Sequence, residues 1–247
     1  MPEPVTSLTG QPTAALGRIL AGIRDRHPDI EPGTVDDGPR PDEPGHPEYH
    51  RRVRAEWALD RWTTATPPRY QEANTMHAAV QAWAIRVVAN PTTAGNLLLT
   101  GTTGTGKTHE AYGALRAVAA AGPSVYEIRA TTAADMYGLL RPKGSERGAE
   151  EELRRLARVP LLLLDDLGSA KATEWTEEVT YRLVNERYNS CRPTIYTSNL
   201  PADARDGAGV RRGPDLTIAL GERIVSRLSQ DTTVVAMTGP DRRRTAA

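Results

Sequence analysis

Between residues 96 and 239 the chain alternates short apolar runs with longer segments in which apolar residues recur every three or four positions. The short runs predict buried strands, and the recurrence predicts helices that bury one face. Such alternation is typical of an α/β fold, in which helices cover both faces of a mostly parallel sheet. We therefore expect a three-layer αβα core around five strands. The predicted strands are 96–100, 124–130, 161–166, 193–199 and 232–239, and the predicted helices are 107–121, 132–140, 149–159, 174–190 and 216–230.

The first ninety or so residues differ and predict a helical N-terminal extension. Residues 13–27 place Leu16, Ile19, Leu20 and Ile23 at helical spacing, so a short amphipathic helix is expected there. Its apolar stripe packs either on a partner or on its own domain, and the pattern does not choose between them. Residues 28–47 are dense in Pro, Gly and Asp and predict a flexible linker.

Two further helices are expected before the first strand. Residues 47–62 place Tyr49, Val53 and Trp57 on one side of a helix that also carries several arginines. Residues 77–90 form the second, and Pro91 ends it.

Composition narrows the class of protein. The 31 basic and 31 acidic side chains balance, so any nucleic-acid surface must be a local patch. The lone Cys191 excludes a disulfide or a cysteine zinc site within one chain. The N-terminus lacks the pattern of a signal peptide, and the apolar runs are too short to cross a bilayer. These features predict a cytoplasmic protein without a membrane partner.

The segment "GTTGTGKT" supplies the strongest chemical signal. It fits G-x-x-x-x-G-K-[ST] between a predicted strand and a predicted helix, which is the setting of a phosphate-binding loop. Its backbone amides are expected to surround the phosphates of ATP, Lys107 to reach the β- and γ-phosphates, and Thr108 to bind Mg²⁺ through its hydroxyl. A Gly/Thr-rich turn that matches by chance is the alternative. The predicted nucleotide-binding residues are Gly101, Thr102, Thr103, Gly104, Thr105, Gly106, Lys107 and Thr108.

The segment "LLLLDDLG" ends a buried strand with two carboxylates. We expect Asp165 to bind Mg²⁺ and Asp166 to orient or deprotonate the attacking water. A strand that ends in a polar turn is the alternative, and it is common. The position of the pair, one βα unit after the glycine-rich loop, favours the catalytic interpretation.

Two more polar groups follow. In "PTIYTSNLP", Asn199 is the expected holder of the attacking water and Thr197 the lesser candidate; an ordinary strand end explains this segment equally well. In "GERIVSRLSQ", Arg223 and Arg227 lie four residues apart and so share one helix face. An arginine can stabilise the charge that develops on the γ-phosphate, but spacing alone favours a solvated basic face.

Taken in order, "LLLTGTTGTGKTHEAYGAL", "LLLLDDLG", "RPTIYTSNLP" and "LGERIVSRL" resemble the AAA+ ATPases of the DnaC/DnaI helicase-loader and IstB group. The resemblance runs from about residue 67 to about residue 242. It implies that Asn199 is the sensor-1 residue and that Arg227 acts in trans as an arginine finger, with Arg223 as the second candidate. It also raises a DNA-contacting role for Arg141 and Lys143.

The resemblance implies a P-loop AAA+ core with a minimal or absent helical lid. The resemblance marks an ATPase domain at 67–242. Composition and periodicity divide the rest into a flexible segment (1–47), a basic and aromatic helix (48–66) and a tail (243–247). Unlike DnaI-type loaders, the N-terminal region has no cysteines for zinc.

The expected function is that of a Mg²⁺-dependent ATPase of DNA replication. The resemblance implies a replicative-helicase loader that binds a replicative helicase and single-stranded DNA, and that forms homo-oligomers with shared ATP sites. An IstB-like transposition helper is the first alternative. A small-molecule P-loop kinase and a nucleotide-binding adaptor with little turnover are the others.

Overall fold

The computed structural model describes residues 18, 21–22, 25–26, 38–205 and 207–242. The chain divides into two compact units, Met1–Arg40 and Pro41–Ala247. In the first unit, the described residues Arg18, Ala21, Gly22, Asp25 and Arg26 are helical. The apolar positions of the helix predicted at 13–27, Leu16, Ile19, Leu20 and Ile23, lie outside the described residues.

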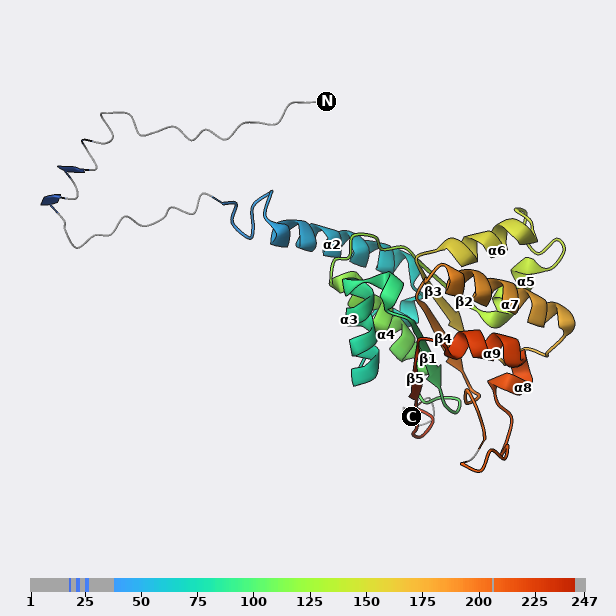
Figure 1. The fold of residues 1–247 in the computed structure, drawn as a ribbon. Helices are drawn as coiled ribbons and strands as arrows, with labels where there is room; N and C mark the ends of the chain where they lie inside the picture. Colours follow the sequence, from blue (N-terminus) through green and yellow to red (C-terminus); the bar gives the residue numbers. More distant parts are fainter. Residues whose placement is uncertain (1–17, 19–20, 23–24, 27–37, 206, 243–247) are drawn as a thin grey trace. The chain divides into compact units, whose positions relative to one another are not determined.

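Five parallel strands form one sheet in the described part of the second unit (Figure 1), which confirms the predicted α/β class. The strand order is β2-β3-β4-β1-β5, so the strand before the glycine-rich loop lies near the centre. The strands are β1 (Asn96–Thr100), β2 (Ile128–Thr132), β3 (Leu161–Asp165), β4 (Thr194–Ser198) and β5 (Thr232–Ala236).

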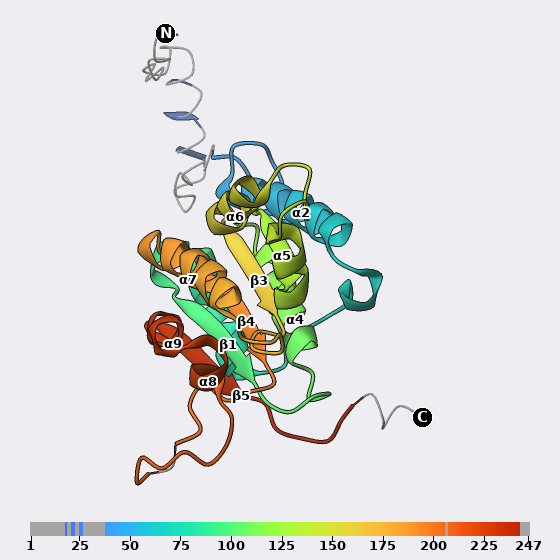
Figure 2. The same ribbon diagram turned by 90° about the vertical axis from the view of Figure 1, so that its right-hand side faces the viewer.

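Helices cover both faces of this sheet (Figures 1 and 2). The first face carries α2 (Pro47–Ala65), α3 (Ala78–Ala89) and α4 (Lys107–Ala120). The second face carries α5 (Ala133–Leu140), α6 (Ala149–Arg158), α7 (Glu174–Asn189), α8 (Leu216–Leu220) and α9 (Glu222–Ser229). Short 3₁₀ turns, η1 (Pro68–Tyr70) and η2 (Pro91–Thr93), follow α2 and α3.

The leucine runs of the central strands serve two hydrophobic cores. Successive side chains of a strand point to opposite faces, so Leu97 and Leu99 pack under α3 and α4, while Leu98 packs on the other side. All three are fully buried. Burial of each leucine contributes about 1.5–3 kcal/mol, which explains why continuous apolar runs rather than alternating ones mark these strands.

Two predicted elements were placed wrongly. The strand expected at 124–130 begins only at Ile128, because Tyr126 turns into the first core and donates its hydroxyl to the Leu115 carbonyl at 3.0 Å. The helix expected at 216–230 is broken at Gly221, where φ is +89°. A residue with a side chain would be strained at this positive φ, so the turn between α8 and α9 favours glycine.

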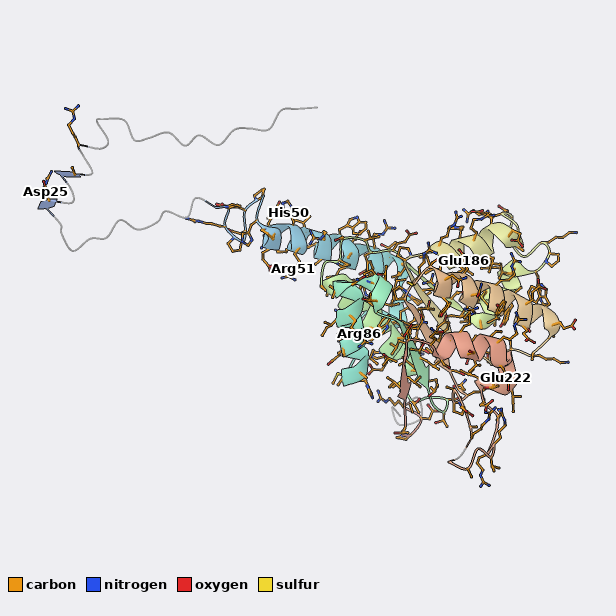
Figure 3. All side chains as sticks on the ribbon, viewed as in Figure 1. Asp25, His50, Arg51, Arg86, Glu186 and Glu222 are labelled. Carbon is orange, nitrogen blue, oxygen red and sulfur yellow. The ribbon has the colours of Figure 1, made fainter. Side chains whose placement is uncertain are left out.

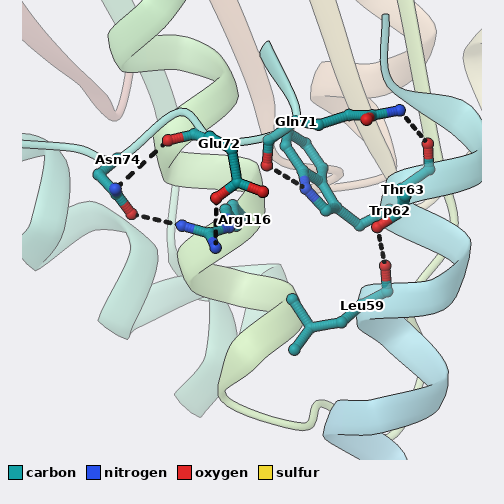
Figure 4. Close-up of polar contacts among 7 residues, drawn as sticks. All are labelled: Leu59, Trp62, Thr63, Gln71, Glu72, Asn74 and Arg116. Carbon is teal, nitrogen blue, oxygen red and sulfur yellow. Dashed lines mark hydrogen bonds and ion pairs between the residues drawn. The ribbon is translucent and has the colours of Figure 1, made fainter. Parts of the chain in front are cut away.

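The first face also fixes the segment between α2 and α3 (Figure 4). Trp62 on α2 donates its indole N–H to the Gln71 carbonyl at 3.3 Å. Arg116 on α4 donates to the Asn74 side chain at 2.6 Å and to the Glu72 carboxylate at 3.3 Å. These contacts hold the η1 turn beside α4.

The outer faces of the helices carry charges of both signs, as the balanced composition requires. Figure 3 labels Arg51 on α2, Arg86 on α3, Glu186 on α7 and Glu222 on α9, and all four are exposed. On α2, the predicted stripe does not face the core: Val53 and Trp57 are 44% and 47% exposed, and the helix packs through Ala58 and Trp62 instead.

Candidate functional site

The site lies at the carboxyl edge of the sheet, where three neighbouring strands end. In the register, Thr100 of β1 lies beside Ser198 of β4, and Leu164 of β3 lies beside Tyr196 of β4. The polar residues that follow these strands therefore meet. They line a cavity of about 890 Å³, which falls in the size range of small-molecule sites. Its lining comprises Arg69, Tyr70, Thr103, Gly104, Gly106, Lys107, Thr108, His109, Thr132, Asp165, Asp166, Thr197, Asn199 and Arg242.

The glycine-rich loop leads directly into the N-terminus of α4. Unpaired amides and the helix dipole make such an N-terminus favourable for phosphate. Lys107 is the first residue of the helix and is 7% exposed. Its ammonium donates to the carbonyls of Gly101 and Thr102, both at 2.8 Å, so it lies across the mouth of the loop.

Not every residue of the loop faces the cavity. Gly101, Thr102 and Thr105 do not line it. Thr105 is buried and donates its hydroxyl to the Thr102 carbonyl at 2.9 Å. We interpret Thr105 as a residue that shapes the loop from within.

A hydrogen-bond chain joins α4, β3 and β4. Thr108 Oγ1 donates to Asp165 Oδ1 and Oδ2 at 3.1 and 3.2 Å. Thr197 Oγ1 donates to Asp165 Oδ1 at 2.5 Å and accepts the backbone N–H of Asp166 at 2.9 Å. The Thr197 hydroxyl is thus already used to orient both acidic residues. This differs from the water-holding role considered for Thr197.

Asn199 extends this hydrogen-bond network from Asp166 to Lys107. Its side-chain oxygen accepts from the Lys107 ammonium at 2.9 Å, and its side-chain nitrogen donates to Asp166 Oδ1 at 2.9 Å. The amide therefore lies between the expected phosphate-binding lysine and the expected catalytic carboxylate. Asp166 is held with φ at +57°, in the left-handed region that non-glycine residues seldom adopt. Such strain is often retained at functional sites.

The donor set suits Mg²⁺ together with a nucleotide. Mg²⁺ is usually bound by one or two carboxylates, by substrate phosphates and by several waters. The Asp165 carboxylate and the Thr108 hydroxyl are adjacent oxygen ligands beside the phosphate-binding loop. Within the described residues no group of three His, Cys, Asp or Glu side chains is placed to hold a metal ion.

Five lining residues were not among the predicted site residues: Arg69, Tyr70, His109, Thr132 and Arg242. His109 follows Thr108 on α4, and Thr132 ends β2. Arg69 and Tyr70 come from η1, which the contacts of Figure 4 hold beside α4. Tyr70 stacks on Tyr112 of α4 with ring centroids 4.5 Å apart. The segment "PPRY" was the only local signal, and it marks a turn rather than a ligand.

Arg242 reaches the cavity from beyond the last strand. Its backbone N–H donates to the Gly104 carbonyl at 3.0 Å, so the chain crosses the glycine-rich loop. A Cβ at Gly104 would lie 1.9 Å from Asp241 Oδ1, so the close approach needs glycine. Nothing in the basic segment "DRRRTAA" distinguishes this arginine from a solvated one.

Tyr112 lies beneath the cavity, and its burial changes the pKa of its hydroxyl. Burial, followed by the negative charge of Asp165, raises the pKa of Tyr112 to about 12. The buried Tyr112 ring supports Tyr70 by the stacking described above.

The structure does not bring every candidate to this cavity. Arg223 and Arg227 lie on α9 and do not line it. Arg141 and Lys143 lie in the exposed loop between α5 and α6, where Arg141 stands over the Trp175 ring at 5.9 Å. The helices of the described part include none that is long and apolar enough to span a membrane.

Comparison with known families agrees with this geometry. The model of the family described as IstB-like ATP binding protein matches residues 73–245. The replicative helicase loader DnaC of Escherichia coli (strain K12) is 27% identical over 135 residues, which cover 54% of this chain and 49% of that protein. A Mycobacterium tuberculosis protein described as an ATP-binding protein in an insertion sequence is 26% identical over 148 residues, 60% of this chain and 55% of that protein. The chain thus spans about half the length of these curated relatives.

Solved structures show the same fold. The crystal structure of the DnaC helicase loader matches with a TM-score of 0.55 and 25% identity, covering 70% of this chain and 100% of that one. The replication initiator DnaA bound to AMPPCP and single-stranded DNA matches with a TM-score of 0.53 and 20% identity, covering 70% of this chain and 51% of that one. The second match is a likeness of fold alone. Together with the parallel sheet they confirm the expected AAA+ core.

Proposed function

Since the chain belongs to the family of IstB-like ATP binding proteins, we propose that it hydrolyses ATP with Mg²⁺ and couples the nucleotide state to DNA and a partner protein. The observation that carries this proposal is the unbroken hydrogen-bond chain at the carboxyl edge of the sheet. It joins Thr108, Asp165, Thr197 and the Asp166 amide, and it continues from the Asp166 side chain through Asn199 to Lys107. Five of these side chains are those that the sequence motifs assigned to ATP, to Mg²⁺ or to the attacking water: Lys107, Thr108, Asp165, Asp166 and Asn199.

The proposed reaction is attack of water on the γ-phosphorus of ATP. A new P–O bond forms to the water oxygen, the bond to the β-phosphate bridging oxygen breaks, and ADP and phosphate are released. The Asp166 carboxylate orients the water and accepts its proton, and Asn199 holds both the carboxylate and the water in place. Lys107 leaves its loop carbonyls for the β- and γ-phosphates and stabilises their charge.

Asp165 and Thr108 are the proposed Mg²⁺ ligands. When bound, the ion neutralises charge on the β- and γ-phosphates. Thr197 keeps the Asp165 carboxylate turned toward Thr108 by donating to Oδ1.

The proposed biological role is that of a replicative-helicase loader with shared ATP sites in a homo-oligomer. The similarity to DnaC supports it. An IstB-like transposition helper is the second candidate, because the family model and the insertion-sequence relative favour it. Both roles use the same ATPase core and differ in the partner protein.

The ATPase proposal is tested with purified protein and two variants. Lys107→Ala should lose ATP binding, measured by titration calorimetry. Asp166→Asn should bind ATP with similar affinity but lose hydrolysis, measured as phosphate release. Normal hydrolysis by Asp166→Asn would show that another group activates the water.

The two roles are separated by the partner. ATP-dependent co-sedimentation with a replicative helicase from the same organism would support loading. Binding to a transposase on DNA, with no binding to the helicase, would support the second candidate.

A further inference from the structure

The two arginines of α9 lie on tyrosine rings of α7. The Arg223 guanidinium stands over the Tyr181 ring at 4.6 Å from its centroid. The Arg227 guanidinium stands over the Tyr188 ring at 4.8 Å. The arginines are four residues apart on α9, and the tyrosines are seven residues apart on α7. The two Arg–Tyr pairs therefore lie side by side on one surface.

The break at Gly221 makes these pairs possible. A continuous helix from 216 to 230 would keep the direction of α8, whereas the extended backbone of Gly221, at φ +89° and ψ +151°, turns the chain before Glu222. After the turn, α9 packs beside α7 (Figures 1 and 2) and buries Ile224 and Leu228. These two apolar side chains fix the rotation of α9, which places Arg223 and Arg227 over the tyrosines.

The charge of these arginines is not matched by a carboxylate. Within the described part of the chain, neither Arg223 nor Arg227 forms an ion pair with Asp or Glu, whereas Arg51, Arg154 and Arg182 do. A tyrosine face holds a guanidinium through its quadrupole without neutralising the charge. Both arginines also act on the Tyr181 hydroxyl: the proximity of Arg223 first, and then of Arg227, lowers its pKa from the ordinary value, because a nearby cation favours the phenolate.

The pairs are open to an incoming group. Arg223 is exposed, and Arg227, Tyr181 and Tyr188 are half-buried. Because α9 does not line the nucleotide cavity of its own chain, an anion that reaches these arginines must come from outside.

We propose that Tyr181 and Tyr188 are positioning residues, which hold Arg223 and Arg227 as a preformed anion receptor for the triphosphate bound to a neighbouring copy of the chain. This inference rests on the proposed function and deepens it. Without the rings, each arginine side chain samples many rotamers. The entropy lost when it becomes ordered at the phosphate then raises the barrier to hydrolysis. With them, the planar guanidiniums are already placed and still positively charged.

The test uses complementation between subunits. Lys107→Ala subunits do not bind ATP but keep α9, and Arg227→Ala subunits bind ATP but lack the arginine. Mixing the two should restore hydrolysis, because the first supplies Arg227 to ATP held by the second. The informative change is then made in the first subunit: Tyr188→Leu removes the ring, and Tyr188→Phe retains it.

Tyr188→Leu in the arginine-supplying subunit should lower the restored kcat about two- to fivefold, as loss of an exposed cation–π contact predicts. The KM for ATP should stay unchanged, because the binding subunit is untouched. Tyr188→Phe should restore hydrolysis as well as the parent subunit does. Tyr49→Leu is the matched control, since Arg52 stands over Tyr49 at 5.7 Å on α2, far along the chain from α9.

The outcomes are distinct. Equal restoration by the Tyr188→Leu and parent subunits, with both folded by circular dichroism, would overturn the positioning role and leave the shared-site mechanism intact. Failure of the plain mixture to restore hydrolysis would overturn the shared site itself, and the positioning role with it. Tyr181→Leu and Tyr181→Phe test Arg223 in the same way. The tyrosine whose replacement by leucine lowers the restored kcat identifies the arginine that acts on the phosphate.

Discussion

At the scale of single residues, the site depends on one buried hydroxyl. Thr197 is 1% exposed and lies near the end of β4, hydrogen-bonded to Asp165, the last residue of β3, and to the amide of Asp166, which follows it. Its Oγ1 donates to Asp165 and accepts from the Asp166 amide, so a single side chain orients the proposed metal ligand and the proposed base. The sequence motifs identify the acids but not this link, because it joins positions 31 and 32 residues apart.

Replacing Thr197 with valine should therefore lower kcat for ATP hydrolysis about 10–100-fold, the usual effect of losing a partner that orients a metal ligand. ATP affinity should change little, since Thr197 contacts neither Lys107 nor the glycine-rich loop. Thr197→Ser keeps the hydroxyl and serves as the control. Steady-state phosphate release checks the prediction, and equal rates for the valine and serine variants would contradict it.

A second residue-scale prediction concerns Arg242, which lines the cavity and is tied by its backbone to Gly104. A guanidinium beside the phosphate-binding loop should stabilise the triphosphate by a charge-assisted hydrogen bond. Arg242→Ala should weaken ATP binding about tenfold in calorimetry. The matched control is Arg158→Ala on α6, an exposed arginine outside the cavity. Equal affinities for the two variants would exclude Arg242 from ATP binding.

At the scale of elements, the short helix α8 is fixed by its N-cap. Asp215 is fully buried, and its carboxylate accepts from the Ile218 amide at 2.9 Å and the Ala204 amide at 3.1 Å, and pairs with Arg211. One side chain thus joins the start of α8 to both ends of the preceding loop. Burial by itself raises the pKa of Asp215, but the Ile218 and Ala204 amides and Arg211 outweigh it, and the pKa is lowered.

A lowered pKa makes this contribution depend on pH. The stabilisation is fully present above the pKa of an unfolded aspartate, about 3.9, and it is lost as the pH falls through the lower folded value. Asp215→Ala should therefore lower the free energy of unfolding by about 1–3 kcal/mol at pH 7. Urea unfolding should show a smaller difference from the unsubstituted protein at pH 3. Asp60→Ala, at an exposed position of α2, is the control, and a difference that does not depend on pH would contradict the assignment.

At the scale of the whole molecule, the proposed ATP site joins elements from both cores. α4 packs in the first core, whereas the Leu164 and Tyr196 side chains of β3 and β4 pack in the second. A ligand that binds only the folded chain stabilises it by mass action. Because its proposed site contacts elements of both cores, ATP should stabilise the whole domain against unfolding, and not only the helices on one face of the sheet.

With Mg²⁺-ATP at about one hundred times its Kd, the free energy of unfolding should rise by about 2.7 kcal/mol. Thermal unfolding followed by circular dichroism should show one transition that moves to higher temperature. Lys107→Ala should show no shift, and Tyr49→Leu on α2 should show the full shift. A shift in the Lys107→Ala variant would place the nucleotide elsewhere.

The residues that could be predicted from the chain alone are those whose constraints are local. The glycine-rich loop, the paired acids and Asn199 each follow an apolar strand, and the parallel α/β pattern brings such strand ends to one edge. The break in the helix predicted at 216–230 also has a local cause, the positive φ of Gly221. It was not predicted, because apolar residues recur at helical spacing on both sides of this glycine. Arg69 and Arg242 gave no such signal, and Thr197 was a candidate only for holding water, not for orienting the two acids. Their roles depend on the η1 turn held by α2 and α4, on the chain crossing Gly104 after β5, and on the pairing of β3 with β4. Arg223 and Arg227 likewise meet Tyr181 and Tyr188 only because α9 packs on α7. Contacts between residues distant in sequence form only when the cores assemble. Periodicity and motif spacing extend over a few residues, so they cannot predict such contacts.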